Sequence, residues 1–363
     1  MKMMTKMKTN KLAYFVAGGT GGHINAALAL GELFQQKGYQ VEFLTGKRPL
    51  DYKLFQGHVV RHLDATPLRI KNPIKLLQGF AKNFITFVSI FFDIRKRKPA
   101  FIVGAGGYVC GPTLLAGYLL GIPVYIVEQN SVMGLTNRIL GNISTKIFVH
   151  FQKTLGLSER LKNKVVVSGN PIRNKISSFS FPLRAVTNDL NLLVFGGSLG
   201  AQEINLLMKE LVQMDFPFRL NIRHQTGLDH EVKELKLGQN VVYEQKKYLE
   251  NMAEEYQWSD LILARAGAST VSELRVVGRP VILVPYPLAT DNHQDGNAKL
   301  FKEEVKFPVY IHSGKELSQN SCQKIIEIIN QQYFWAKNPP QLASYHDKST
   351  ELVLEAILND VQQ

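Results

Sequence analysis

Cysteine is almost absent from this sequence of 363 residues, which contains only Cys110 and Cys322. Two cysteines so far apart cannot form the disulfide framework of a small secreted domain. Neither has a second Cys or a His at metal-ligand spacing, so the sequence predicts no metal site. This scarcity indicates a reducing, cytosolic compartment.

The sequence also lacks an uninterrupted run of about 20 apolar residues, the length that crosses a bilayer. Its first residues, MKMMTKMKTNK, are basic and do not contain the apolar core of a signal peptide. We therefore expect neither a secretion signal nor a membrane-spanning segment.

Acidic residues are scarce in the N-terminal half. Residues 1–170 contain 23 Lys and Arg against 7 Asp and Glu, a net charge of +16, whereas residues 171–363 contain 20 against 23, a net charge of −3. Such asymmetry indicates an anionic partner: nucleic acid, an anionic membrane surface or a phosphorylated substrate. No interleaving of aromatic and basic residues and no RNA-binding motif supports nucleic acid, so we expect no nucleic-acid partner.

The remaining composition, 45% hydrophobic and 20% charged, is that of a globular protein with room for two domains. An apolar strand at 12–17 runs into GGTGGH (18–23), then a helix from about Ile24 to Lys37 and a strand at 40–45. This order is the βαβ unit of a parallel sheet. The glycine turn is not the dinucleotide pattern G-x-G-x-x-G. It fits diphosphate binding, or it is a tight turn without a ligand.

The pattern restarts in the second half of the chain. After a polar stretch at 169–189, an apolar strand at 192–195 runs into GGSLG (196–200) and repeats 14–22 at an offset of 178 positions. The sequence therefore predicts an α/β fold with two tandem Rossmann-like, doubly wound parallel-sheet domains that face each other across a cleft. We place them at 10–172 and 173–344, and we expect a C-terminal helix within 345–363 to pack back on the first domain.

The stretch RAGASTVSE (265–273) follows an apolar strand at 261–264 and opens a segment with helical spacing. The first turn of a helix offers free N–H groups and the positive end of the helix dipole, which together bind anions. Gly267 lets a ligand approach the backbone, Ser269 and Thr270 add hydroxyl donors, and Glu273 can accept hydrogen bonds from sugar hydroxyls. The stretch predicts a nucleotide-sugar site; the alternative is a capped helix start with a solvated glutamate.

Residues 72–98 form an amphipathic segment. Apolar side chains recur at steps of three and four residues and predict one helix or a pair, with basic residues at the ends, Arg95–Lys98 among them. Such a helix binds membrane surfaces, and each Lys or Arg near an anionic leaflet contributes ~1 kcal/mol. The alternative is a core-packing helix with a solvated basic end. The predicted membrane patch is Ile74, Leu77, Phe80, Phe84, Phe87 and Phe91.

Eight ordered motifs carry a resemblance that covers the loops of both halves: GGTGGH, GAGGY, EQN followed by LTNR, GNPIR, GGSLGA, HQTG, RAGASTVSE and HQ…NA at 293–298. The chain resembles the GT-B glycosyltransferases, and among them the peptidoglycan N-acetylglucosaminyltransferases. These enzymes move GlcNAc from UDP-GlcNAc to lipid I, an undecaprenyl-diphosphate-linked MurNAc-pentapeptide, and make lipid II. The resemblance implies a peripheral enzyme of cell-wall synthesis on the cytoplasmic face of the cell membrane. UDP-GlcNAc is a substrate, so the resemblance implies no cofactor. The chemistry usual for this fold is independent of metal ions, so it implies no metal either.

The resemblance also implies site residues. The donor would contact Thr20, Gly21, Gly22, Asn130, Arg173, Ser198, Leu249 (through its backbone, against uracil), Arg265, Ala268, Ser269, Thr270, Glu273 (the ribose) and Gln294. The acceptor diphosphate would lie on Gly18, Gly19, His23, Gly106, Gly107 and Tyr108.

The implied chemistry is one inverting displacement, in which the acceptor 4-hydroxyl attacks the anomeric carbon. We predict His23 as the base, because the positive end of a helix dipole favours the neutral imidazole; the alternative is a loop-bracing residue or a diphosphate ligand. Glu128 and Asn130 are predicted to orient the sugar or the acceptor. Helix N-termini, hydroxyls and Arg265 would stabilise the departing diphosphate.

Three departures from the family pattern lie in the acceptor half: Asn25-Ala26 after GGTGGH, Val127 before EQN, and the stretch Pro67–Ile70. They leave open another lipid acceptor such as diacylglycerol. A UDP-GlcNAc 2-epimerase shares the architecture, and a non-enzymatic nucleotide-sugar sensor at the membrane is a third alternative. The oligomeric state, the identity of the base and the acceptor's stem peptide do not follow from the sequence.

Overall fold

The computed structural model describes residues 11–67, 72–182, 188–197, 200–227, 234–289, 292–312, 319–337 and 347–362. The chain forms two compact units. The first runs to Arg173 and takes up the chain again from Lys348; the second is Asn174–Asp347.

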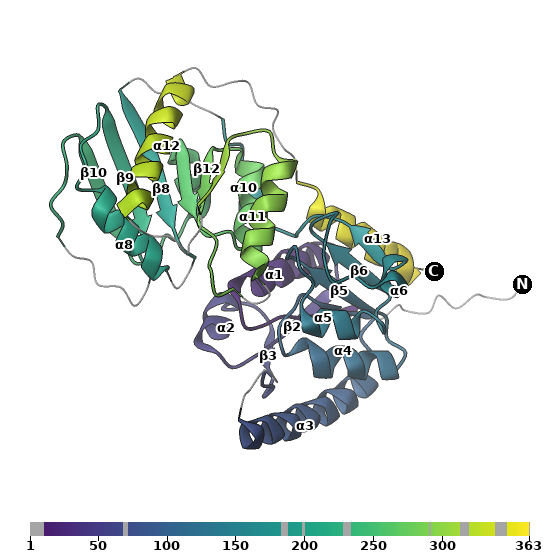
Figure 1. The fold of residues 1–363 in the computed structure, drawn as a ribbon. Helices are drawn as coiled ribbons and strands as arrows, with labels where there is room; N and C mark the ends of the chain where they lie inside the picture. Colours follow the sequence, from purple (N-terminus) through teal and green to yellow (C-terminus); the bar gives the residue numbers. More distant parts are fainter. Residues whose placement is uncertain are drawn as a thin grey trace, which may run out of the picture. The chain divides into compact units, whose positions relative to one another are not determined.

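The first unit is built on a seven-stranded sheet in the order β3-β2-β1-β4-β5-β6-β7, with every pair parallel. Figure 1 labels β2, β3, β5 and β6 of this sheet. Its strands are β1 (Leu12–Val16), β2 (Gln40–Thr45), β3 (Val60–His62), β4 (Phe101–Gly104), β5 (Val124–Glu128), β6 (Lys146–Val149) and β7 (Val165–Val167). Its helices are α1 (Gly21–Gln36), α2 (Pro49–Leu54), α3 (Pro73–Arg97), α4 (Cys110–Leu119), α5 (Leu135–Leu140), α6 (Glu159–Lys162) and α13 (Ser349–Gln362).

Both faces of this sheet are covered. Successive side chains of a strand point to opposite faces, so Phe15 packs in the core that contains α1, while Tyr14 and Val16 pack in the core that contains α3 and α4. The returning helix α13 adds Val353 and Ile357 to the α1 side. Its place is also held by polar contacts, since Lys146 Nζ and the Tyr125 hydroxyl donate to Asp360 at 2.6 and 3.2 Å.

The second unit repeats this topology with a six-stranded parallel sheet in the order β10-β9-β8-β11-β12-β13. Its strands are β8 (Asp189–Phe195), β9 (Arg219–Gln225), β10 (Val241–Lys246), β11 (Leu261–Ala264), β12 (Val281–Leu283) and β13 (Val309–Ile311). Its helices are α7 (Asn174–Ser177), α8 (Gln202–Leu211), α9 (Met252–Trp258), α10 (Ala268–Val277), α11 (His293–Glu304) and α12 (Gln319–Lys337). The predicted fold class, two doubly wound parallel-sheet domains, is confirmed.

The local predictions differ from the structure at several short elements, at one helix and at the start of α1. Strands β3 and β13 and helices α2, α6 and α7 were not predicted, because runs of three to six residues carry too little periodicity. The helix expected after HQTG falls partly on residues outside the described part, and the described residues 234–238 contain no helix. Helix α1 begins at Gly21 rather than near Ile24, because Thr20 caps it. The glycine motif is therefore also the first turn of the helix.

Residues 73–97 form one helix, α3, not a pair. Asn72 caps its start by accepting hydrogen bonds from the N–H groups of Ile74 and Lys75 at 3.0 and 3.1 Å, and Pro73 occupies the first turn, where its missing N–H costs nothing. The helix ends at Lys98 in a left-handed conformation with φ +48°. Ile90 and Ile94 are buried against the sheet and α4.

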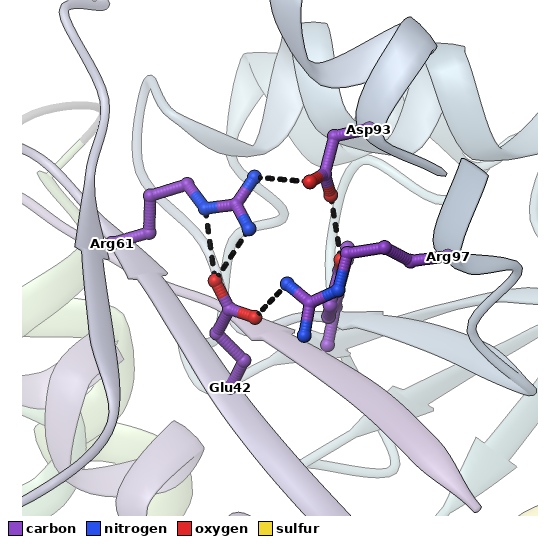
Figure 2. Close-up of polar contacts among 5 residues, drawn as sticks. Glu42, Arg61, Asp93 and Arg97 are labelled. Carbon is purple, nitrogen blue, oxygen red and sulfur yellow. Dashed lines mark hydrogen bonds and ion pairs between the residues drawn. The ribbon is translucent and has the colours of Figure 1, made fainter. Parts of the chain in front are cut away.

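A cluster of four charged residues ties α3 to the sheet (Figure 2). Arg61 of β3 reaches Glu42 of β2 at 2.7 Å and Asp93 of α3 at 2.9 Å, and Arg97 of α3 pairs with the same Glu42. The Tyr14 hydroxyl of β1 donates to Asp93 at 2.6 Å. Burial and the neighbouring Asp93 carboxylate raise the pKa of Tyr14 far above its ordinary value, so this hydroxyl stays a donor. The cluster fixes which face of α3 points outward.

Candidate functional site

The first unit's candidate site lies where strands β1 and β4 end side by side, the point at which the strand order reverses. The loops that follow these strands meet through a hydrogen bond from Gly18 N–H to Gly106 O at 3.3 Å. Gly106 and Gly107 have φ +109° and +93°, and a Cβ on Gly107 would lie 2.2 Å from Gly18 O. Only glycine allows this approach.

His23 stands in the first turn of α1 beside both loops. Its Nδ1 donates to Gly18 O at 3.2 Å, since a carbonyl oxygen can only accept. A Cβ on Gly106 would lie 2.7 Å from the ring's Cδ2, so the ring packs against that glycine. With the proton on Nδ1, Nε2 is the basic nitrogen of this tautomer. The geometry accommodates the predicted base.

Gly18 and Gly19 were predicted to bind the acceptor diphosphate, but their backbone N–H groups already have acceptors within the first unit. Gly18 N–H is used by Gly106, and Gly19 N–H donates to Asp51 Oδ1 at 3.4 Å. The buried Asp51 also accepts from Arg48 N–H at 3.0 Å. Because Asp51 belongs to α2, these bonds attach the glycine loop to that helix. The N–H groups of Gly21 and Gly22, in the first turn of α1, are better placed to meet an anion than those of Gly18 and Gly19.

Arg48 and Asp51 were not singled out from the sequence. Arg48 donates from Nη1 to Gly19 O at 3.2 Å, and its guanidinium lies 5.1 Å from the centre of the Tyr108 ring. This contact joins Tyr108, at the end of the second loop, to the first loop, and its contact with the acceptor diphosphate stays a prediction. Burial raises the pKa of its hydroxyl.

Glu128 is buried and is held by the loop that follows it. Its two oxygens accept four hydrogen bonds, from the backbone and side-chain nitrogens of Asn130 (3.0 and 3.3 Å), from Gly134 N–H (2.9 Å) and from Asn137 Nδ2 (2.9 Å). These bonds brace the loop that presents the half-buried Asn130. A role of Glu128 in orienting the sugar or the acceptor stays a prediction.

The second unit's candidate site lies at the matching point, where β8 and β11 end side by side. Helix α10 begins at Ala268 directly after Gly267, so its first turn faces the strand ends as predicted. The Ser269 hydroxyl oxygen is buried and has no hydrogen-bond partner in the described residues. A buried hydroxyl is normally paired, so this one is ready to receive a ligand. Thr270 is half-buried beside it.

Arg265 is held by contacts within the second unit, and its predicted contact with the donor stays a prediction. Its Nη1 donates to the carbonyl oxygens of Val284 and Pro285 at 3.1 and 3.3 Å, and its Nη2 pairs with Glu203 of α8. Burial lowers the pKa of Arg265, and the charge of Glu203 opposes that shift. Arg265 therefore joins β11, the end of β12 and α8 at the site, with much of its charge neutralised.

Glu273, the predicted ribose ligand, lies in the second turn of α10 and is 6% exposed. Its Oε2 accepts from the Tyr256 hydroxyl of α9 at 2.9 Å. This bond orients the carboxylate. Tyr256 was missed from the sequence because nothing in its spacing relates it to Glu273.

Gln294 and Leu249 are each partly engaged. Gln294 accepts from Tyr286 N–H at 2.9 Å through its carbonyl oxygen, so its amide nitrogen is the group it can offer. Leu249 N–H donates to Gln225 Oε1 at 2.8 Å, and the predicted contact of the Leu249 backbone with uracil stays a prediction. Gln225 also donates to Gly197 O at 2.8 Å and so joins the glycine turn after β8 to Leu249.

For the other residues predicted to contact the donor, the structure gives their position and exposure. Thr20 is exposed and caps α1, with its hydroxyl 3.5 Å from His23 N. Ala268 is buried as the first residue of α10, and Arg173 is half-buried at the end of the first unit's main segment. Ser198 lies outside the described residues.

The predicted membrane patch divides along α3. Ile74, Leu77, Phe80 and Phe84 are exposed, whereas Phe87 and Phe91 are half-buried against the core. Ile85 and Phe92, not included in the prediction, are 67% and 61% exposed and belong to the outer face.

Among the described helices, α3 is the one with the length and composition to cross a membrane, which the sequence did not lead us to expect. Its packing argues for a surface helix, because Asp93 and Arg97 are tied into the charged cluster and Ile90 and Ile94 into the core. Within the described part of the chain, no three His, Cys, Asp or Glu side chains are grouped to hold a metal ion.

Two family models match the chain. The glycosyltransferase family 28 N-terminal domain matches residues 13–149, and the family 28 C-terminal domain matches residues 191–352. These two matches contain the two switch-point sites.

The chain is similar to curated UDP-N-acetylglucosamine–N-acetylmuramyl-(pentapeptide) pyrophosphoryl-undecaprenol N-acetylglucosamine transferases. The Pseudomonas savastanoi protein is 37% identical over 80% of this chain and 82% of its own length. The Rickettsia bellii protein is 34% identical over 88% and 91%.

The chain is also similar to solved structures. Acinetobacter baumannii MurG superposes with a TM-score of 0.70 at 28% identity, over 96% of this chain and 99% of that one. UDP-GlcNAc 2-epimerase from Neisseria meningitidis reaches 0.58 at 16% identity, over 96% of this chain and 100% of that one, which shows a shared fold alone.

Proposed function

The chain belongs to glycosyltransferase family 28, and on that ground we propose that it transfers GlcNAc from UDP-GlcNAc to the muramyl 4-hydroxyl of an undecaprenyl-diphosphate-linked acceptor, with inversion. The product is the lipid-linked disaccharide precursor of peptidoglycan. The observation that carries the donor half is the start of α10. Among the described residues, no side chain caps its first turn after Gly267 and the buried Ser269 hydroxyl has no hydrogen-bond partner.

The donor is assigned to the second unit. The α10 N-terminus and the hydroxyls of Ser269 and Thr270 would meet the diphosphate, whose negative charge grows as it leaves. Glu273, oriented by Tyr256, would accept from the ribose hydroxyls. The carboxylate lies one turn farther along the helix than the hydroxyls, so charge repulsion with the diphosphate is limited.

The acceptor is assigned to the first unit. Its attacking hydroxyl must lose a proton as the new glycosidic bond forms, and His23 Nε2 would take that proton while Nδ1 stays bonded to Gly18 O. Asn130, presented by the braced Glu128 loop, would orient the acceptor or the transferred sugar. No step is assigned to a metal ion or another cofactor.

The membrane carries the lipid-linked acceptor, and α3 would bring the enzyme to its cytoplasmic face. The outward apolar side chains Ile74, Leu77, Phe80, Phe84 and Ile85 lie beside the exposed Lys75 and Lys82, and the helix ends in the basic run Arg95–Lys98. Apolar insertion and attraction to anionic lipids would then act together.

The alternatives are less well supported. A 2-epimerase needs no lipid surface, and the likeness to one is limited to the fold. A transferase acting on diacylglycerol would use the same donor site, so only the acceptor separates it from the proposed function.

One assay tests all three. Radiolabelled UDP-GlcNAc is incubated with the protein and a lipid I analogue, with diacylglycerol, or without an acceptor. We expect label in the lipid-linked disaccharide alone. Transfer to diacylglycerol, or appearance of UDP-ManNAc without an acceptor, would overturn the proposal.

A further inference from the structure

Two backbone donors of the first glycine loop are already engaged within the protein. The backbone N–H groups of Gly18 and Gly19 are already used by Gly106 O and Asp51 Oδ1. Asp51 is a buried carboxylate directly beneath the loop, and its charge disfavours a second anion there. A diphosphate at these loops would therefore gain from a nearby cation, in addition to the N–H groups of Gly21 and Gly22 at the start of α1.

Arg48 is a cation that touches both loops. Its Nη1 donates to Gly19 O of the first loop at 3.2 Å, and its guanidinium lies 5.1 Å from the ring centre of Tyr108 at the end of the second. Arg48 is exposed, so a ligand in solvent can reach its side chain. A guanidinium carries five N–H donors, more than these contacts use.

Local structure holds Arg48 in this position. Its backbone N–H donates to Asp51 Oδ2 at 3.0 Å, and Pro49 follows it at the start of α2 with a fixed φ. Asp51 also accepts a hydrogen bond from Gly19 N–H at 3.4 Å, so one carboxylate holds both the first glycine loop and the backbone of Arg48 in position.

We propose that Arg48 binds the diphosphate of the lipid-linked acceptor at the rim of the two glycine loops. The inference rests on the proposed function and names a ligand for its acceptor. A guanidinium can form two parallel hydrogen bonds to phosphate oxygens, which gives geometric preference as well as charge. Arg48 takes no part in proton transfer; it positions the acceptor so that its hydroxyl meets His23.

The test compares Arg48→Gln and Arg48→Lys with the matched control Lys47→Gln, which removes one positive charge from the adjacent exposed residue. Two short-chain acceptor analogues are used, one with MurNAc on a diphosphate and one with MurNAc on a monophosphate. For Arg48→Gln we expect the KM for the diphosphate analogue to rise about tenfold or more, the loss of a charged hydrogen bond, with the donor KM unchanged. The preference of the wild type for the diphosphate analogue should shrink by a similar factor, and Arg48→Lys should recover part of it.

A purely structural role would give another pattern. If Arg48 only braces Gly19, Arg48→Gln should lower kcat on both analogues alike and leave the preference intact, which would overturn the inference. An equal rise in KM for Lys47→Gln would also overturn it, by assigning the effect to general surface charge. A wild type that transfers to neither analogue refutes the proposed function itself, and that result is distinct from both.

Discussion

Gly107→Ala tests the meeting of the two glycine loops, on which the acceptor site depends. Gly107 has φ +93°, and a Cβ there would lie 2.2 Å from Gly18 O. Real Cβ atoms essentially never come within 3.0 Å of another heavy atom, so one loop must move by at least 0.8 Å (3.0 − 2.2). Gly18 O is also the acceptor of His23 Nδ1, so this movement disturbs the predicted base.

The cost has two parts. Placing alanine at positive φ costs about 1–2 kcal/mol, and overpacking against backbone costs about 1–3 kcal/mol more. The control is Gly57→Ala, at an exposed position with φ +87° and nothing within 4 Å of the added Cβ. It carries the first cost without the second.

The assay is denaturant unfolding of both variants together with the rate of GlcNAc transfer. We expect Gly107→Ala to lower the free energy of unfolding by at least about 1 kcal/mol more than Gly57→Ala does. The transfer rate of Gly107→Ala should fall, while that of the control stays near wild type. Equal stability and equal transfer in the two variants would show that the loops do not meet as described, and the argument for His23 would fail with them.

Three further predictions concern other parts of the chain. Ser269→Ala should raise the donor KM by about threefold or more with no loss of stability, because its hydroxyl has no hydrogen-bond partner among the described residues. The control Ser272→Ala removes a hydroxyl that donates to a backbone carbonyl 2.7 Å away and should leave the donor KM unchanged. An equal donor KM in the two variants would remove Ser269 from the site. The double change Phe84→Ser and Ile85→Ser should release the protein from anionic vesicles without a change in its unfolding midpoint, as both side chains are exposed; retained vesicle binding would show that α3 is not the membrane contact. Burial raises the pKa of the Cys110 thiol to about 12. The thiol should therefore resist alkylation at pH 9 in the folded protein and react on unfolding, as mass spectrometry would show. Prompt labelling of the native state would contradict its burial.

The sequence was informative wherever the physics is local or repeated. Apolar strands that end in glycine turns, repeated half a chain apart, were enough for two parallel-sheet domains, because a strand buried on both faces has few other arrangements. Asn72-Pro73 marks the start of α3 by capping, and the three- and four-residue steps that follow mark its helical period. The stretch 265–273 likewise placed a free helix start after β11.

What only the tertiary structure decided is which groups of these motifs remain available. The donors of Gly18 and Gly19, the carboxylate of Glu128 and the guanidinium of Arg265 all belong to predicted site motifs, yet each is engaged by a protein partner. Arg48 and Tyr256 drew no attention in the sequence, because their relation to the site depends on contacts with segments distant along the chain. Sequence spacing records which residues share one turn or strand, whereas hydrogen bonds between loops depend on how the whole sheet brings those loops together. The motifs therefore predict where the sites lie, and the fold determines which of their atoms already have a partner within the protein.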